Sequence, residues 1–142
     1  MGKTNVIVDT GLLVGYFNRR DAHHTWSKDQ LSRVGPPLHT CEAVLSETVH
    51  LLEGTDRGIR SLLTFLQRGA VTVSFSYPVH ADDIQDLLRR YADQPMSSAD
   101  ACLVAMSEEW NDSCIVTTDN DFRRYRTTDG EPLDVRLLDG NR

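Results

Sequence analysis

Asn5-Val-Ile-Val-Asp9 decides the fold, together with the apolar segment Leu12-Leu-Val-Gly-Tyr-Phe17 that follows it. The first segment is rich in β-branched residues, which is typical of a buried strand, and it ends in an acid. The second segment predicts a compact helix directly after that strand. A strand that passes straight into a helix indicates a fold built from alternating strands and helices.

The rest of the chain continues this alternation. Further strands are predicted at residues 38–39, 70–75, 113–118 and 133–138, and further helices at residues 21–34, 41–53, 57–67, 81–91 and 98–110. Thr40 is a suitable N-cap for the helix over 41–53. The helix over 98–110 is apolar almost all round, which predicts that it is buried. We therefore expect a three-layer α/β/α sandwich with a mostly parallel central sheet.

Length and composition limit the kind of protein. A chain of 142 residues is the size of one domain and buries a sufficient core without disulfides. Lys and Arg total 15 against 21 Asp and Glu, so the formal net charge is −6. That balance argues against gripping nucleic acid through overall positive charge. No apolar run approaches the ~18 residues of a membrane span and no secretory signal is visible, so we expect a cytoplasmic protein without a membrane partner.

Two predicted strands end in an acid. Asp9 follows Val6-Ile-Val8, and Asp119 follows Cys114-Ile-Val-Thr-Thr118. In open parallel α/β sheets, ligands bind at the carboxyl ends of the strands, and carboxylates there suit Mg²⁺ or Mn²⁺. The alternative is that each acid caps the helix or turn that follows it.

Asp100 lies near the start of the most apolar predicted helix. Leu103 and Val104 share its face, so its side chain is expected to point toward a buried region. A buried carboxylate needs a cation or hydrogen-bond donors. Ser97-x-x-Asp100 also has the spacing of a capping box, so a capping role is the alternative.

Glu42 and Glu47 compete for one place in a possible acidic site. Five residues of separation place them about 140° apart around a helix. Each flanks one edge of the apolar arc that contains Val44, Leu45 and Val49. Helix geometry therefore does not choose between them, and a solvent-facing position is the default for either.

Four motifs occur in a fixed order along the chain: Val8-Asp9-Thr10-Gly11-Leu12-Leu13, Thr40-x-x-x-Val44-Leu45-x-Glu47, Ala99-Asp100-Ala101 and Thr117-Thr118-Asp119-x-Asp121-Phe122. This order resembles the PIN-domain ribonucleases, and in length the chain is similar to VapC-type toxins. The resemblance implies a single PIN domain over residues 1–142 and an endoribonuclease that depends on Mg²⁺ or Mn²⁺. It matches Asp9, Glu47, Asp100 and Asp119 to the catalytic, metal-binding acids, and Asp121 to a more variable fifth metal position.

The same resemblance suggests how RNA is contacted. Thr10 and Thr118 match hydroxyl residues beside the first and last acids, and we expect both to bind substrate. The basic residues that follow these motifs are Arg19, Arg20, Arg123 and Arg124. Guanidinium groups match phosphate oxygens, so Arg123 and Arg124 are expected to bind RNA, with a solvated charged surface as the alternative.

Protein partners are also implied. A type II toxin is held in check by an antitoxin, and we expect an Arg- or Lys-bearing tail of that partner to enter the acidic crevice near Asp9, Asp100 and Asp119. The apolar helical faces at 12–17 and 62–66 are expected to carry the remaining contact, or a homodimer.

Other classes fit the sequence less well. Haloacid-dehalogenase-like phosphatases carry a second Asp two residues after the first, where this chain has Gly11. A phosphate-binding Gly-rich loop and a dinucleotide fingerprint are both missing from the sequence. A catalytically idle PIN scaffold that binds RNA or a protein is the remaining alternative, although an idle site has no reason to keep carboxylates crowded together.

Overall fold

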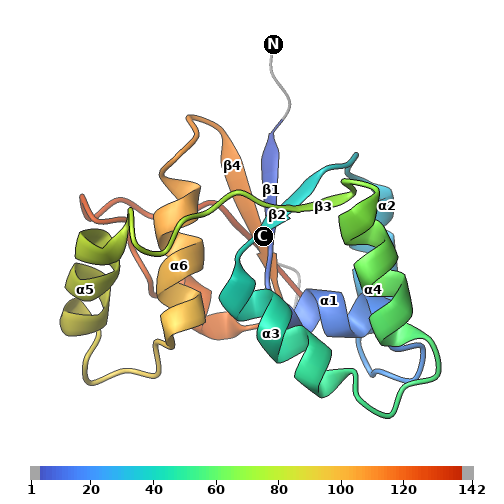
Figure 1. The fold of residues 1–142 in the computed structure, drawn as a ribbon. Helices are drawn as coiled ribbons and strands as arrows, with labels where there is room; N and C mark the ends of the chain where they lie inside the picture. The colour runs from blue at the N-terminus through green and yellow to red at the C-terminus, as the bar shows by residue number, and fades with distance from the viewer. Residues whose placement is uncertain (1–3, 139–142) are drawn as a thin grey trace.

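A five-stranded sheet forms the centre of the computed structural model, which describes residues 4–138 (Figure 1). The strand order is β3-β2-β1-β4-β5, and each pairing in this sheet is parallel. The strands are β1 (Asn5–Val8), β2 (Leu38–Thr40), β3 (Val71–Val73), β4 (Ser113–Thr117) and β5 (Val135–Leu137). All five predicted strands are therefore confirmed, and the two that end in acids, β1 and β4, are neighbours.

Helices cover both faces of this sheet (Figure 1). They are α1 (Thr10–Phe17), α2 (His24–Ser32), α3 (Glu42–Leu51), α4 (Gly58–Gln67), α5 (Ala81–Arg90) and α6 (Ser98–Ser107), followed by the short 3₁₀ helix η1 (Asn120–Arg123). The pair α5 and α6 lies on one side, and α1, α2 and α4 lie on the other, while α3 contacts both α1 and α6. The expected three-layer α/β/α sandwich is confirmed. Within residues 4–138, no helix combines the length and apolar character needed to cross a membrane.

The core corrects one prediction about protein contacts. Leu12 and Leu13 are fully buried and Phe17 is 9% exposed, so the apolar face at 12–17 is core and does not offer a surface to a partner. In α4, Leu62 is also fully buried, whereas Leu63 is 45% exposed. The helix α6 is buried along residues 100–106, as its all-round apolar character predicts.

The predicted N-cap of α3 is wrong by one residue. Cys41 occupies the N-cap position and makes no side-chain capping hydrogen bond. Thr40 is instead the last residue of β2, and its hydroxyl donates to the backbone carbonyl of Val8 at 2.9 Å. The Thr40 hydroxyl therefore bonds to the neighbouring strand β1 and does not cap α3.

Gly11 permits a close approach between α1 and the segment after β4. A Cβ atom at Gly11 would overlap the side-chain oxygen of Thr118. The first turn of α1 therefore lies directly against the end of the segment that carries Asp119, and this contact brings the ends of β1 and β4 together.

Candidate active site

Asp9 lies at the junction of β1 and α1, at the carboxyl edge of the sheet. It is the N-cap of α1, because its Oδ1 accepts a hydrogen bond from the Thr10 backbone N–H at 2.7 Å. Its Oδ2 accepts a second hydrogen bond from the Thr117 hydroxyl at 2.7 Å. The capping interpretation is therefore correct, but it accounts for only one oxygen of a side chain that is 7% exposed.

Asp119 follows β4 and begins η1. Its Oδ1 accepts a hydrogen bond from the Asp121 backbone N–H at 2.9 Å, and its own N–H donates to Thr117 Oγ1 at 3.0 Å. The Thr117 hydroxyl thus connects Asp9 to the segment of Asp119. Asp121 turns its carboxylate toward Arg124, with 2.7 Å between Oδ1 and Nη2.

Asp100 is part of a capping box at the start of α6. Its backbone N–H donates to Ser97 Oγ at 3.0 Å, and its Oδ2 accepts from the Ser97 N–H at 3.2 Å. The capping alternative is therefore realised. The Tyr125 hydroxyl donates to the same Oδ2 at 3.1 Å, and the whole side chain of Tyr125 is buried. Asp100 is consequently held in one orientation by three groups of the protein.

These three acids affect one another electrostatically. Burial raises the pKa of Asp9 to about 6, and the negative charges of Asp100 and Asp119 add to the rise. Burial is also the largest cause that raises the pKa of Asp100 and of Asp119. Hydrogen bonds to Asp9 from Thr117 and Thr10 lower its pKa but do not cancel the effect of burial. The structure therefore brings together three carboxylates whose ionised forms are disfavoured.

Glu47 is linked to this group through Thr10. The Thr10 hydroxyl donates to Glu47 Oε1 at 3.0 Å, which joins the first turn of α1 to the middle of α3. Thr10 is the chain neighbour of Asp9, so the Glu47 carboxylate lies beside the acidic group. Glu42 and Glu47 are both exposed, but among residues 4–138 Glu42 makes no side-chain hydrogen bond to this group. Helix geometry alone does not distinguish the two glutamates, and the contact with Thr10 is made by Glu47.

The carboxylate groups of these acids suit a hard divalent cation better than their arrangement does. Among residues 4–138, no three His, Cys, Asp or Glu side chains are arranged to hold a metal ion together. Hydrogen bonds explain this, because both oxygens of Asp9 and Oδ2 of Asp100 are directed at protein donors. Carboxylate oxygens are nevertheless the ligands that Mg²⁺ and Mn²⁺ prefer, and a cation stabilises carboxylates whose ionised forms are disfavoured by burial and by neighbouring negative charge. The donor set therefore fits such an ion.

Two residues of the site carry no clear signal in the sequence. Thr117 is fully buried between Asp9 and Asp119, although only its neighbour Thr118 was expected in the site. Tyr125 stands in an arginine-rich run, and nothing local marks its contact with Asp100. Both contacts join distant parts of the chain, so only the folded arrangement reveals them.

The arginines predicted to bind RNA lie on or after η1. Arg123 is exposed, as its position in a short surface helix requires. Arg124 is engaged with the protein, since its Nε donates to Gln94 Oε1 at 3.1 Å and its Nη2 pairs with Asp121. A phosphate at Arg124 therefore competes with Gln94 and Asp121 for these N–H groups.

The model of the PIN domain family matches residues 6–127, which is most of the chain. The protein therefore belongs to the PIN domain family, and the predicted family is confirmed. Among solved structures, the fold is similar to that of VapC20 from Mycobacterium tuberculosis, described as a sarcin–ricin loop cleaving toxin. The two share 22% sequence identity with a TM-score of 0.71, over 82% of this chain and 92% of VapC20. No curated protein matches the sequence.

Proposed function

We propose that this protein is an endoribonuclease that hydrolyses RNA phosphodiester bonds with the help of Mg²⁺ or Mn²⁺, and that it is the toxin of a toxin–antitoxin pair. One observation carries the proposal: Asp9, Asp100 and Asp119 lie together in partly or fully buried positions, where burial raises the pKa of each and the charges of Asp100 and Asp119 raise that of Asp9 further. Membership of the PIN domain family supports it, as does the similarity in fold to an RNA-cleaving toxin.

Each acid has a role in this proposal. Asp9 and Asp100 hold the metal ion, Glu47 and Asp119 complete its surroundings, partly through water, and Asp121 is a further, more variable ligand. The bound ion supplies an activated water and neutralises charge on the phosphate and the leaving oxygen. No side chain needs to form a covalent bond to the substrate.

Neighbouring side chains orient these acids. Thr117 donates to Asp9 and Tyr125 donates to Asp100, so each carboxylate is held in a fixed orientation. Thr10 holds Glu47 in the same way. Thr10 and Thr118 also contact the substrate in this proposal, and the arginines Arg123 and Arg124 bind its phosphates.

The same acidity suggests how the enzyme is controlled. An antitoxin tail with Arg or Lys side chains would bind the carboxylates in place of metal and RNA. We include this partner, a homodimer and a cytoplasmic location in the proposal. Expression of the chain without its partner, beside the Asp9→Asn variant, tests the toxin role. Slower growth with the wild type alone is expected, and equal growth of both strains contradicts a toxin without contradicting a nuclease.

Cleavage by the purified protein tests the nuclease. The substrates are ribosomal RNA that contains the sarcin–ricin loop and a mixture of tRNA and mRNA, each with Mn²⁺, Mg²⁺ or EDTA. We expect cleavage with metal and none with EDTA. Asp9→Asn and Asp100→Asn should each lower the rate by about 1,000-fold, because neutral amides stabilise a divalent cation and developing charge poorly.

Asp129→Asn is the matched control, since Asp129 lies in an exposed turn and should keep wild-type activity. Full activity in EDTA, or in both acid variants, rejects the proposal. Wild-type protein that binds RNA and leaves it uncut in Mn²⁺ would support the idle scaffold.

A further inference from the structure

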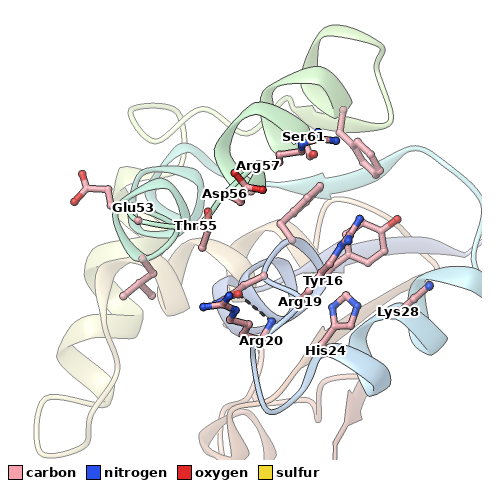
Figure 2. A pocket seen from close by; sticks show the side chains of 16 residues that line it. Tyr16, Arg19, Arg20, His24, Lys28, Glu53, Thr55, Asp56, Arg57 and Ser61 are labelled. Atoms are coloured by element: carbon pink, nitrogen blue, oxygen red, sulfur yellow. Dashed lines mark hydrogen bonds between the residues drawn. The ribbon is translucent and has the colours of Figure 1, made fainter.

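A groove of about 1160 Å³ lies beside the C-terminal ends of α1 and α3 (Figure 2). Asp9 lies at the other end of α1. One wall comes from the end of α1, the connection to α2 and the start of α2. The opposite wall comes from the end of α3, the connection between α3 and α4, and the face of α4 that contains Ser61 and Phe65. In Figure 2, Arg20, His24 and Lys28 lie along the first wall, with Asp56 and Arg57 across from them.

Positive charge is concentrated in this groove. Its charged lining residues are four cations and two acids, namely Arg19, Arg20, Lys28 and Arg57 against Glu53 and Asp56. The four cations are exposed, and none forms an ion pair with a residue among 4–138. By contrast, Arg33, Arg89 and Arg124 each pair with a nearby acid. In a chain of net charge −6, four unpaired cations in one groove form a local site for an anion.

The groove is built on closely packed backbone. A Cβ atom at Gly58 would lie 2.6 Å from Thr55 Oγ1 and 3.1 Å from the backbone carbonyl of Phe17. The start of α4 therefore sits directly on the end of α1, and no larger residue fits between them. The two walls of the groove, one with Arg19, Arg20 and Lys28 and the other with Arg57, therefore pack on each other at this point.

We propose that this groove binds the phosphodiester backbone of the RNA substrate, on the part of the strand next to the nucleotides at the acids. This inference rests on the proposed nuclease activity. The helix α1 begins beside Asp9 and ends at the groove, and its eight residues rise about 10 Å. A stacked strand advances about 3.4 Å per nucleotide, so three or four nucleotides reach from one place to the other.

The lining favours RNA over an acidic protein segment. Tyr16, His24 and Phe65 line the same groove as the cations, and the rings of Tyr16 and Phe65 lie 5.8 Å apart at a tilt of 59°. Bases stack on aromatic rings while cations contact the phosphates, whereas the carboxylates of an acidic segment would contact the cations and leave the rings unused. An acidic site also repels RNA, and cations a few nucleotides away offset that repulsion.

Binding measured without metal tests the groove apart from catalysis. The probe is a fluorescein-labelled 12-nucleotide RNA in EDTA, followed by fluorescence anisotropy over a series of KCl concentrations. The double variant Arg19→Gln with Arg20→Gln should raise Kd by about five- to tenfold. It should also reduce the slope of log Kd against log salt by about 1.4, the value for two lost phosphate contacts on a single strand.

The control is Arg33→Gln with Arg89→Gln, which removes the same charge from exposed arginines outside the groove. It should change Kd less than twofold and leave the slope unchanged. The double variant Lys28→Gln with Arg57→Gln tests both walls of the groove if the first variant does not fold by circular dichroism. It should weaken binding as the first variant does.

Three results separate the possibilities. Equal shifts in the groove and control variants show an effect of net charge and overturn the proposal. A polyglutamate peptide that displaces the RNA at equal charge concentration assigns the groove to a protein and also overturns it. Cleavage of RNA by the wild type in Mn²⁺ is measured separately. If the groove variants bind RNA more weakly but the wild type does not cleave it, the proposed nuclease activity is rejected and the groove is not. If the wild type cleaves RNA but the groove variants keep the wild-type Kd, the groove proposal alone is rejected.

Discussion

The acids and the basic groove lie at opposite ends of α1, and the two places differ in how far their charged side chains are buried. At the first end, Asp9 and Asp100 are buried and fixed by hydrogen bonds, and burial raises the pKa of both, with a further rise from neighbouring negative charges. At the other end, Arg19 and Arg20 are exposed and form no ion pair with a residue among 4–138. Buried like charges destabilise a fold until a cation arrives, whereas exposed charges affect stability little.

This difference separates two kinds of residue. A change at the acid end should alter stability, pH dependence and chemistry together, because the same carboxylates determine all three. A change in the groove should alter the affinity for RNA and its dependence on salt, with little effect on folding. The predictions below apply this division to single residues.

After the losses expected for Asp9→Asn and Asp100→Asn, the next largest effect on the cleavage rate is expected at Glu47. Glu47→Gln should lower the cleavage rate by about 10- to 100-fold, since its carboxylate lies beside Asp9 through the Thr10 hydroxyl. Glu42→Gln on the same helix should stay within about twofold of wild type, because Glu42, which is as exposed as Glu47, lacks the hydrogen bond to Thr10. Initial rates on one RNA in Mn²⁺ compare the two variants. A greater loss in Glu42→Gln would reverse the assignment.

A smaller effect is expected at Thr117. Thr117→Val keeps the shape of the side chain but removes the hydroxyl that donates to Asp9 and accepts from the Asp119 N–H. It should lower the free energy of unfolding by about 1–2 kcal/mol, as measured by urea denaturation in EDTA at pH 7. Thr64→Val removes a hydrogen bond that is exposed to solvent and should change it by less than about 0.5 kcal/mol. An unchanged urea midpoint for Thr117→Val would mean that this hydroxyl does not hold the acids.

Much of this arrangement could be predicted from local sequence, and some of it could not. The strands and the acids at their ends follow from β-branched runs and from the rule that ligands bind at carboxyl edges. The cap of α3 was misplaced because Thr40 bonds to β1, a contact 32 residues away. The groove could not be predicted either, because Arg20 and Arg57 lie on connections that are far apart in the sequence. Periodicity reports which face of an element is buried, and it does not report which distant polar groups meet there.

The pH dependence of stability should reveal the burial of Asp9. Its folded-state pKa of about 6 lies above the ordinary value of 3.8, so the folded protein favours the protonated acid. This contribution makes the metal-free fold less stable as the pH rises from about 4 to about 6, and the loss persists at higher pH. Asp9→Asn removes it. The stability gained by this substitution should therefore be about 1–1.5 kcal/mol larger at pH 8 than at pH 5.

Urea denaturation in EDTA at the two pH values measures this difference, and Asp129→Asn is the control that should show none. The same gain at pH 5 and pH 8 would mean that Asp9 is as well solvated as an ordinary carboxylate. That result would also weaken the inference that the fold keeps Asp9, Asp100 and Asp119 together although burial and mutual repulsion disfavour their ionised forms.

The smallest effect compares one arginine from each end. Arg124 lies near the acids but is paired with Asp121 and Gln94, whereas Arg20 lies in the groove and has no ion-pair partner among residues 4–138. A paired cation gives up its partner when it binds a phosphate, so its net gain is smaller. Arg124→Gln should raise the Kd for the 12-nucleotide RNA in EDTA by about 2-fold or less, and Arg20→Gln by about 3-fold. Anisotropy at 50 mM KCl measures both under conditions in which no metal joins RNA to the acids. If Arg124→Gln weakens binding more than Arg20→Gln does, the RNA is held mainly at the acid end, and the groove is secondary.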